Sequence, residues 1–190
     1  MPRAASIHRV NPATLPALFT LLLATMGCQQ AAQSAAPAAK GPCALLKQSE
    51  VAAVFPGAKA GEVDTSREQY GITACVWNTA SSRFVAQYWK AVGGSAQDEA
   101  KGLMLGVVDP LKPGAANNVR IETVTGVGDQ AVAAVETQDE QRGILGDMAM
   151  LTVQKGDQIL VLMAPELAHM DRAKALAALK SLGSSSASRL

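Results

Sequence analysis

Three cysteines offer the most chemistry in this chain of 190 residues, and they stand at positions 28, 43 and 75. A thiol pair that exchanges disulfides uses a Cys-x-x-Cys spacing, and no two of these cysteines stand that close. A structural disulfide and a covalently modified thiol are the remaining interpretations. Because their number is odd, one cysteine is expected to stay outside any disulfide within the chain.

The first cysteine follows an apolar leader. Residues 1–13 carry Arg3 and Arg9 and no acidic residue, and residues 15–26 form an apolar run. A helix that spans a bilayer needs roughly twenty apolar residues, and this run is shorter. The pattern therefore predicts a signal peptide over residues 1–27.

The end of that run, Ala24-Thr25-Met26-Gly27-Cys28, resembles the bacterial lipobox. The resemblance implies that Cys28 is diacylated, becomes the new N-terminus and anchors an extracytoplasmic protein to the membrane without spanning it. Gln29 follows, where a retention aspartate would stand, which implies the outer membrane if the cell is Gram-negative. Lipidation of Cys28 would leave Cys43 and Cys75 as a disulfide pair; the alternative is ordinary cleavage with Cys28 as a free thiol.

Composition describes the rest of the chain. Hydrophobic residues make up 48% and charged residues 17%, which is typical of a globular protein rather than a disordered one. Without Arg3 and Arg9 of the leader, 15 basic residues face 16 acidic residues, a net charge of −1. The sequence has no basic patch, so no nucleic-acid partner is predicted. Residues 28–41 are rich in alanine and glutamine and read as a flexible tether.

Residues 42–183 alternate strand-like and helix-like segments and form one expected globular domain. The pattern predicts an α+β fold, with an antiparallel sheet of about six strands and two to three helices packed on one face. A hairpin and then a helix occur at 72–105 and again at 147–182, which suggests two hairpin-helix units. Residues 184–190 are expected to be a disordered tail. Strands are expected at 60–65, 72–79, 83–91, 119–125, 130–137, 148–154 and 158–163, and helices at 49–55, 95–105 and 165–182.

Short motifs along the domain occur in one order. Over residues 42–182 the chain resembles a broad set of small bacterial lipoproteins with a secreted domain of unknown function, best known from actinobacteria. The resemblance implies an α+β domain with a bridge between Cys43 and Cys75, and it implies no catalytic residue, cofactor or ligand. The motifs are Cys43-Ala44-Leu45-Leu46, Ser49-Glu50-Val51, Cys75-Val76-Trp77, Gly126-Val127-Gly128-Asp129 and Lys155-Gly156-Asp157.

Three further patterns imitate functional sites. Gly126-x-Gly128-x-x-Ala131, with Asp147 further on, imitates a dinucleotide fingerprint, but residues 130–137 are too short for the required helix, so a turn is expected. Glu166-x-x-His169 occurs once, whereas di-iron bundles use two such motifs. The acids Glu136, Asp139, Glu140 and Asp147 lack the alternation of a calcium loop. No metal, cofactor or catalytic residue is therefore assigned.

Four aromatic residues are the candidate contact surface, because aromatic side chains dominate contact energies. They are Tyr70, Phe84, Tyr88 and Trp89. The main hypothesis is a non-enzymatic, membrane-anchored extracytoplasmic domain that binds or senses a small ligand or an envelope protein. One alternative is a structural or accessory lipoprotein that docks to a larger complex. The other is a hydrolase whose site the sequence does not reveal.

Overall fold

The computed structural model describes residues 41–91, 93–99, 102, 120–137 and 148–190. All of them belong to residues 38–190, which cluster as one compact unit separate from residues 1–37. The leader, Cys28 and the tether up to residue 40 lie outside the described residues, as does most of the predicted helix beyond residue 99.

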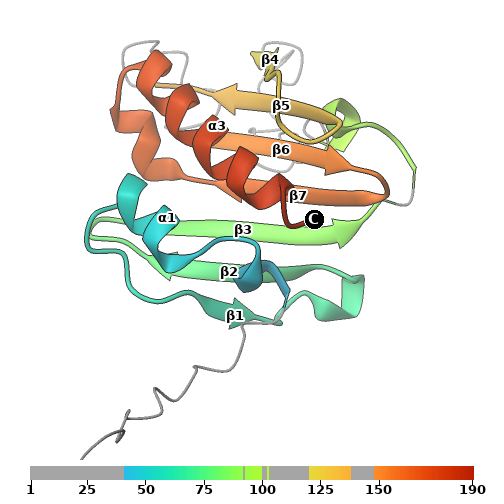
Figure 1. The fold of residues 1–190 in the computed structure, drawn as a ribbon, viewed down its shortest axis with the longest axis horizontal. Coiled ribbons are helices and arrows are strands. Elements are labelled where there is room, and N and C mark those ends of the chain that lie inside the picture. The colour runs from blue at the N-terminus through green and yellow to red at the C-terminus, as the bar shows by residue number, and fades with distance from the viewer. Residues whose placement is uncertain (1–40, 92, 100–101, 103–119, 138–147) are drawn as a thin grey trace, which may run out of the picture. The chain divides into compact units, whose positions relative to one another are not determined.

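Seven strands of the described chain form one antiparallel sheet in the order β1-β2-β3-β7-β6-β5-β4 (Figure 1). Strands β1 to β3 form one meander and β4 to β7 another, and the two meet where β3 pairs with β7. The predicted α+β class is confirmed, with seven strands rather than about six. The strands are β1 (Glu62–Asp64), β2 (Thr73–Asn78), β3 (Arg83–Lys90), β4 (Ile121–Thr123), β5 (Gln130–Val135), β6 (Ala149–Lys155) and β7 (Gln158–Met163).

Two α-helices, α1 (Gln48–Val54) and α3 (Arg172–Ala187), lie on the same face of the sheet (Figure 1). Helix α1 begins where the Lys47 amide donates to the Glu50 carboxylate at 2.7 Å, and it ends just before Pro56, which disfavours helical backbone at the residue before it. Shorter 3-10 helices complete the described elements: η1 (Gly41–Ala44), η2 (Glu68–Tyr70) and η5 (Pro165–His169).

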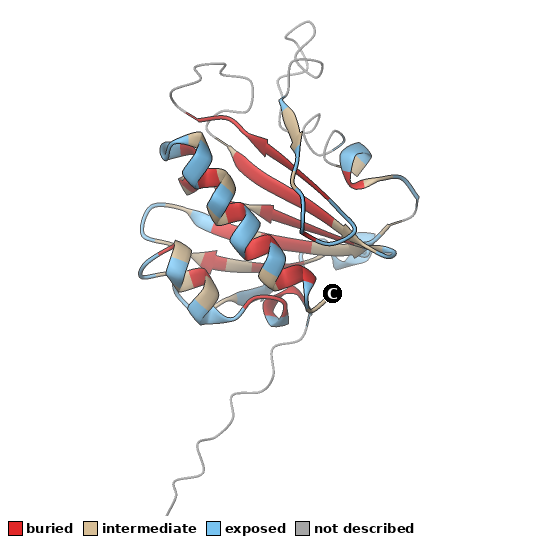
Figure 2. Cartoon of the chain, turned by 45° about the horizontal axis from the view of Figure 1, so that its top comes forward, coloured by how far each residue is buried: buried red, intermediate tan, exposed pale blue. Residues whose placement is uncertain are grey.

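The main core lies between these helices and the sheet. Leu151 of β6, Leu160 and Leu162 of β7, and Leu179 of α3 are fully buried there. Figure 2 shows the central strands as the most continuously buried part of the chain. The two strands expected at 148–154 and 158–163 are among these buried strands, and strands that are covered on both faces carry near-continuous apolar runs.

The opposite face of the sheet is also apolar. Met150, Ile159 and Val161 are buried on it, and Trp89 and Met163 pack against them. The helical turn at 96–99 is placed on this face, because Ala96 packs against Val132 and its amide donates to Gln154 Oε1 at 2.9 Å. A capping box starts this turn: the Ser95 amide donates to Asp98 Oδ2 at 3.1 Å, and the Asp98 amide donates to Ser95 Oγ at 3.2 Å.

The C-terminal helix differs from its prediction at both ends. Pro165 begins η5, and a new helix then starts at Asp171, whose carboxylate accepts the Lys174 amide at 3.0 Å as an N-cap. The helix was expected to end at Gly183, but α3 continues to Ala187. The prediction of a disordered tail over 184–190 is therefore wrong, because Ser186 and Ala187 are buried against the domain.

The end of the chain is held by an ion pair with α1. Arg189 donates from Nη2 to Glu50 Oε1 at 2.6 Å and from Nη1 to Glu50 Oε2 at 2.8 Å, and Nη1 also donates to the Leu45 carbonyl at 2.8 Å. The hydrogen bond from Arg189 is the main cause that lowers the pKa of Glu50 below its usual 4.5. We call this pair of residues the α1–α3 clasp.

Candidate functional site

The four aromatic residues of the candidate contact surface do not come together. Tyr70 in η2 is 72% exposed, whereas Phe84 is 1% exposed in the main core, with its ring 5.2 Å from those of Phe55 and Trp77. Tyr88 packs on the same core, and Trp89, one residue on, packs on the opposite face. Phe84 is a core residue, and its assignment to a contact surface was wrong because strand alternation turned it inward.

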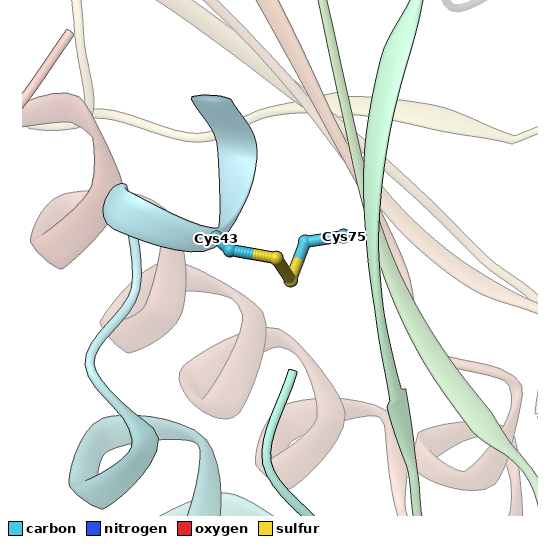
Figure 3. Close-up of a disulfide and its surroundings, with 2 residues drawn as sticks. All are labelled: Cys43 and Cys75. Atoms are coloured by element: carbon cyan, nitrogen blue, oxygen red, sulfur yellow. A yellow bond between two sulfur atoms is a disulfide. The ribbon is translucent and has the colours of Figure 1, made fainter. Parts of the chain in front are cut away.

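Cys43 and Cys75 form the disulfide that the resemblance implied. It joins η1 to β2, with 5.0 Å between the two Cα atoms (Figure 3). Cys43 is 8% exposed and Cys75 is fully buried. Neither sulfur offers the exposed, electropositive surroundings of a reactive thiol, so the bond acts as a structural staple.

The backbone passes close to this disulfide at Gly61. A Cβ atom there would lie 2.7 Å from Cys75 Sγ and 2.6 Å from the Trp77 indole nitrogen. Real Cβ atoms do not approach other atoms so closely, so only glycine fits at this position.

The sequence Gly126-Val127-Gly128-Asp129 is a turn between β4 and β5, as expected. Gly126 and Gly128 have φ angles of 80° and 58°, and strand β5 follows rather than a helix. Asp129 Oδ2 accepts the Gly156 amide at 2.7 Å, which ties this turn to the β6–β7 turn. The glycines therefore serve a turn and not a pyrophosphate.

The remaining polar motifs are spread out. Glu166 and His169 lie in η5, Glu136 is buried after β5, and Asp139, Glu140 and Asp147 lie outside the described residues. In the described ranges, no three His, Cys, Asp or Glu side chains gather to hold a metal ion. No helix in those ranges is long and apolar enough to cross a membrane.

A pocket of about 480 Å³ lies at the end of the sheet where the β2–β3 turn meets the end of β7 and the residue before β6. We call it the end pocket. One end of its lining is polar and the other is apolar. The lining residues are Asn78, Thr79, Ser81, Ser82, Arg83, Val85, Met148, Met163 and Pro165.

The β2–β3 turn positions the polar side of the end pocket. The Thr79 amide donates to the Ser82 carbonyl at 3.0 Å, and the Ser82 amide donates to Thr79 Oγ1 at 3.0 Å. These bonds close a short turn after the last strand pair, Asn78 with Arg83. The turn therefore presents two serine hydroxyls and one guanidinium at the rim.

Strand pairing builds the apolar side. Val85 pairs with Met163, and Met163 pairs with Met150 on its other side. These residues alternate with the core-facing Phe84 and Leu162, so they face away from α3. The end pocket thus opens beside the face of the sheet that α1 and α3 do not cover.

Among the described residues that line the end pocket, Arg83 is the only charged one. Its side chain is exposed and makes no ion pair within the described part of the chain. No carboxylate of the residues that the structure describes lines the pocket. The described lining therefore combines one guanidinium that makes no ion pair, although its charge acts on Asp64 outside the pocket, with several hydroxyl groups and an apolar wall.

A second pocket of about 440 Å³ lies at the other end of the sheet. It is lined by Gln97 and by the residues of the β4–β5 turn, 123–132. Its one charged group, Asp129, already accepts the Gly156 amide. The end pocket is the stronger candidate because its cation is unpaired and apolar side chains adjoin it.

The fold and its sites define a disulfide-stapled α+β domain with an antiparallel sheet and a partly polar pocket at one sheet end. No protein-family model, curated protein or solved structure matches the chain.

Sequence reasoning did not single out Arg83, Met148 or Met163. Arg83 follows the serine-rich turn 80–82, which marks it as the first residue of a strand. Only the pairing of β3 with β7 brings Met163 opposite Val85, on the same strand as Arg83. Nothing in the sequence states that these two strands are neighbours. Strand order was the missing signal.

Proposed function

We propose that this chain is an extracytoplasmic domain, lipid-anchored through Cys28, that binds a ligand and catalyses no reaction. The observation that carries the binding role is the end pocket, with its unpaired guanidinium beside an apolar wall. Its volume lies within the roughly 300 to 1,000 Å³ of small-molecule sites. The described residues that line it include no nucleophile with an adjacent base, which favours binding over catalysis.

The Cys43–Cys75 disulfide supports an extracytoplasmic location. Structural disulfides persist in oxidising compartments and are rare in reducing ones. The apolar leader and Cys28 point the same way. If the alanine- and glutamine-rich segment before η1 acts as the tether that the sequence predicts, it would let the domain range about 20 Å from its lipid anchor.

Mass spectrometry of protein extracted from membranes tests the anchor. We expect a chain that begins at Cys28 and carries acyl groups on it, and we expect Cys28→Ser to remove the acyl mass. An unmodified Cys28, or a start beyond it, would refute the anchor and leave the fold untouched.

A photo-reactive amino acid at Ser81, on the rim of the end pocket, tests the binding role in cells. We expect a small-molecule adduct there. The control position is Ser184, which is exposed on α3 and does not line the pocket. We expect no such adduct at Ser184.

Docking to a larger assembly is the second candidate function. It is favoured by Tyr70 in η2, which is 72% exposed, and by Val63 in the edge strand β1, which is 51% exposed. A photo-reactive residue at position 70 would then give a protein adduct, while Ser81 gives none. That pair of results would replace ligand binding by docking.

A further inference from the structure

The charge and the shape of the end pocket narrow its ligand. From these features we propose that it binds an anionic amphiphile, a phosphate or carboxylate head group on a short apolar chain. This inference rests on the proposed binding function and names its ligand class.

The guanidinium of Arg83 specifies the anionic head group. Among the described arginines, Arg189 pairs with Glu50, and Arg172 pairs with Glu122 at 3.1 Å, whereas Arg67 makes no ion pair within the described part of the chain but does not line the pocket. The Arg83 side chain has neither an ion pair nor a hydrogen bond in the described ranges; its charge acts on Asp64, which does not line the pocket, and no acidic side chain of the described residues lines the pocket with it. A planar guanidinium matches phosphate and carboxylate oxygens with two parallel hydrogen bonds.

The turn beside Arg83 supplies further donors for the same head group. Ser81 and Ser82 place hydroxyl groups on the rim, and Asn78 adds a side-chain amide. Hydroxyl and amide groups donate to anionic oxygens without adding charge. The polar side of the end pocket is therefore suited to one anion and not to a cation.

The opposite wall specifies the apolar chain. Val85 and Met163 are strand partners on one face, and Met148 and Pro165 extend that wall beyond the strand ends. Methionine side chains adapt to ligands of irregular shape because they are unbranched and polarizable. A fully polar ligand would leave this wall in contact with water, so an amphiphile fits better than a sugar or a free phosphate ion.

Calorimetry with matched probes tests the ligand class. The protein is the chain from residue 28 onward with Cys28→Ser, which contains the whole compact unit of residues 38–190. The probes are octyl phosphate, octanoate, octan-1-ol, octylammonium and inorganic phosphate. We expect both anionic amphiphiles to bind about tenfold or more tightly than the alcohol, and the cation and inorganic phosphate to bind weakest.

The two anionic probes also separate the sources of the ligand. Tighter binding of octyl phosphate indicates a phospholipid head group, and tighter binding of octanoate indicates a free fatty acid. Either result supports the proposal, because both share the anion and the chain.

Variants of Arg83 show whether the probes bind in the end pocket. We expect Arg83→Gln to abolish the preference for the anions over octan-1-ol, and Arg83→Lys to retain part of it. Arg67→Gln removes another exposed arginine, outside the pocket, and is expected to change nothing. Ser81→Glu adds a negative charge at the rim and is expected to weaken anion binding even if Arg83→Gln fails to fold.

Three results would overturn the ligand class: equal affinity for the alcohol and the anions, an unchanged preference in Arg83→Gln, or no binding of any probe. A small-molecule adduct at Ser81 together with one of these results would refute the ligand class alone. If the adduct at Ser81 is also missing, the binding function itself fails.

Discussion

At the residue scale, the disulfide is the contact whose removal has the most calculable effect. Cys43 and Cys75 are 32 positions apart, and cross-linking a loop of that size stabilises a fold by about 3 to 4 kcal/mol in the chain-entropy model. We expect Cys43→Ala with Cys75→Ala to lower the free energy of unfolding by that amount, as measured by denaturant titration.

Reductant supplies the control for that measurement. The unsubstituted protein under reducing conditions should lose about the same stability, whereas the double variant should not respond to reductant. A double variant as stable as the unsubstituted protein would show that the bond adds nothing to the fold.

Gly61 is a second residue whose identity the fold demands. Its missing Cβ leaves room for the Trp77 indole and Cys75 Sγ. We expect Gly61→Ala to destabilise the domain by about 1 to 3 kcal/mol, because the neighbouring side chains must move out of their packed positions. Thermal unfolding measures this loss.

Gly102→Ala is the matched control, because no atom of the described residues lies within 4 Å of a Cβ atom at that position and its φ is not positive. It should leave the melting temperature unchanged or raise it slightly. Equal effects of the two substitutions would contradict the close approach at Gly61.

At the scale of elements, the α1–α3 clasp joins the first and last helices of the domain. The side chains of Glu50 and Arg189 are 24% and 26% exposed and share two short hydrogen bonds. Because solvent screens a partly exposed pair, we expect Glu50→Gln to cost about 1 kcal/mol at neutral pH.

The pH dependence of the clasp follows from the lowered pKa of Glu50. A carboxyl group whose pKa is lower in the folded state stabilises that state above its unfolded pKa, and the gain is lost as the pH falls through the folded pKa. The difference in stability between Glu50→Gln and the unsubstituted protein should therefore be full at pH 7 and shrink below pH 4.5. Glu68→Gln, which removes an exposed carboxylate in η2 outside the clasp, is the matched control variant.

The elements themselves were mostly predictable from the sequence. Alternation of apolar residues located the strands, and the dense hairpin over 148–163 proved to be the central pair, β6 and β7. Gly183 was misread because glycine commonly ends a helix, yet here it lies within α3 and is buried. A Cβ atom at Gly183 would overlap Leu151 Cδ2, so this glycine lets α3 approach β6 closely.

The end pocket was not predictable, because it depends on which strands are neighbours. Arg83 and Met163 belong to segments that are far apart in the sequence, and no local pattern pairs β3 with β7. The four aromatic residues were predicted to form one contact surface, and this prediction was wrong for a related reason. Phe84 and Trp89 stand at even and odd positions of one strand, so they face opposite sides of the sheet. Spacing along one strand gives its two faces but not what lies across from them.

At the scale of the whole molecule, the C-terminal third provides the centre of the sheet. Strands β6 and β7 lie between the two outer groups of strands, and α3 covers the main core. We therefore expect the fragment 38–137 to be unfolded or aggregated, although it contains β1 to β5 and both cysteines of the disulfide. Circular dichroism and gel filtration measure this.

A fragment with native-like sheet signal and a monomeric elution volume would contradict that expectation. The unit 38–190 under the same conditions is the reference, because it holds all seven described strands.

The pairing of β3 with β7 has a consequence for the order of folding. Chains are synthesised from the N-terminus, so the β1–β3 meander emerges long before the strand that completes it. Until β7 arrives, β3 presents an open row of amides and carbonyls, which is a template for pairing with another chain. The disulfide lies wholly within this early half and can close before β7 arrives. Oxidation would then hold η1 against β2 while the edge of β3 still awaits its partner, so the covalent step and the completion of the sheet are separable in time.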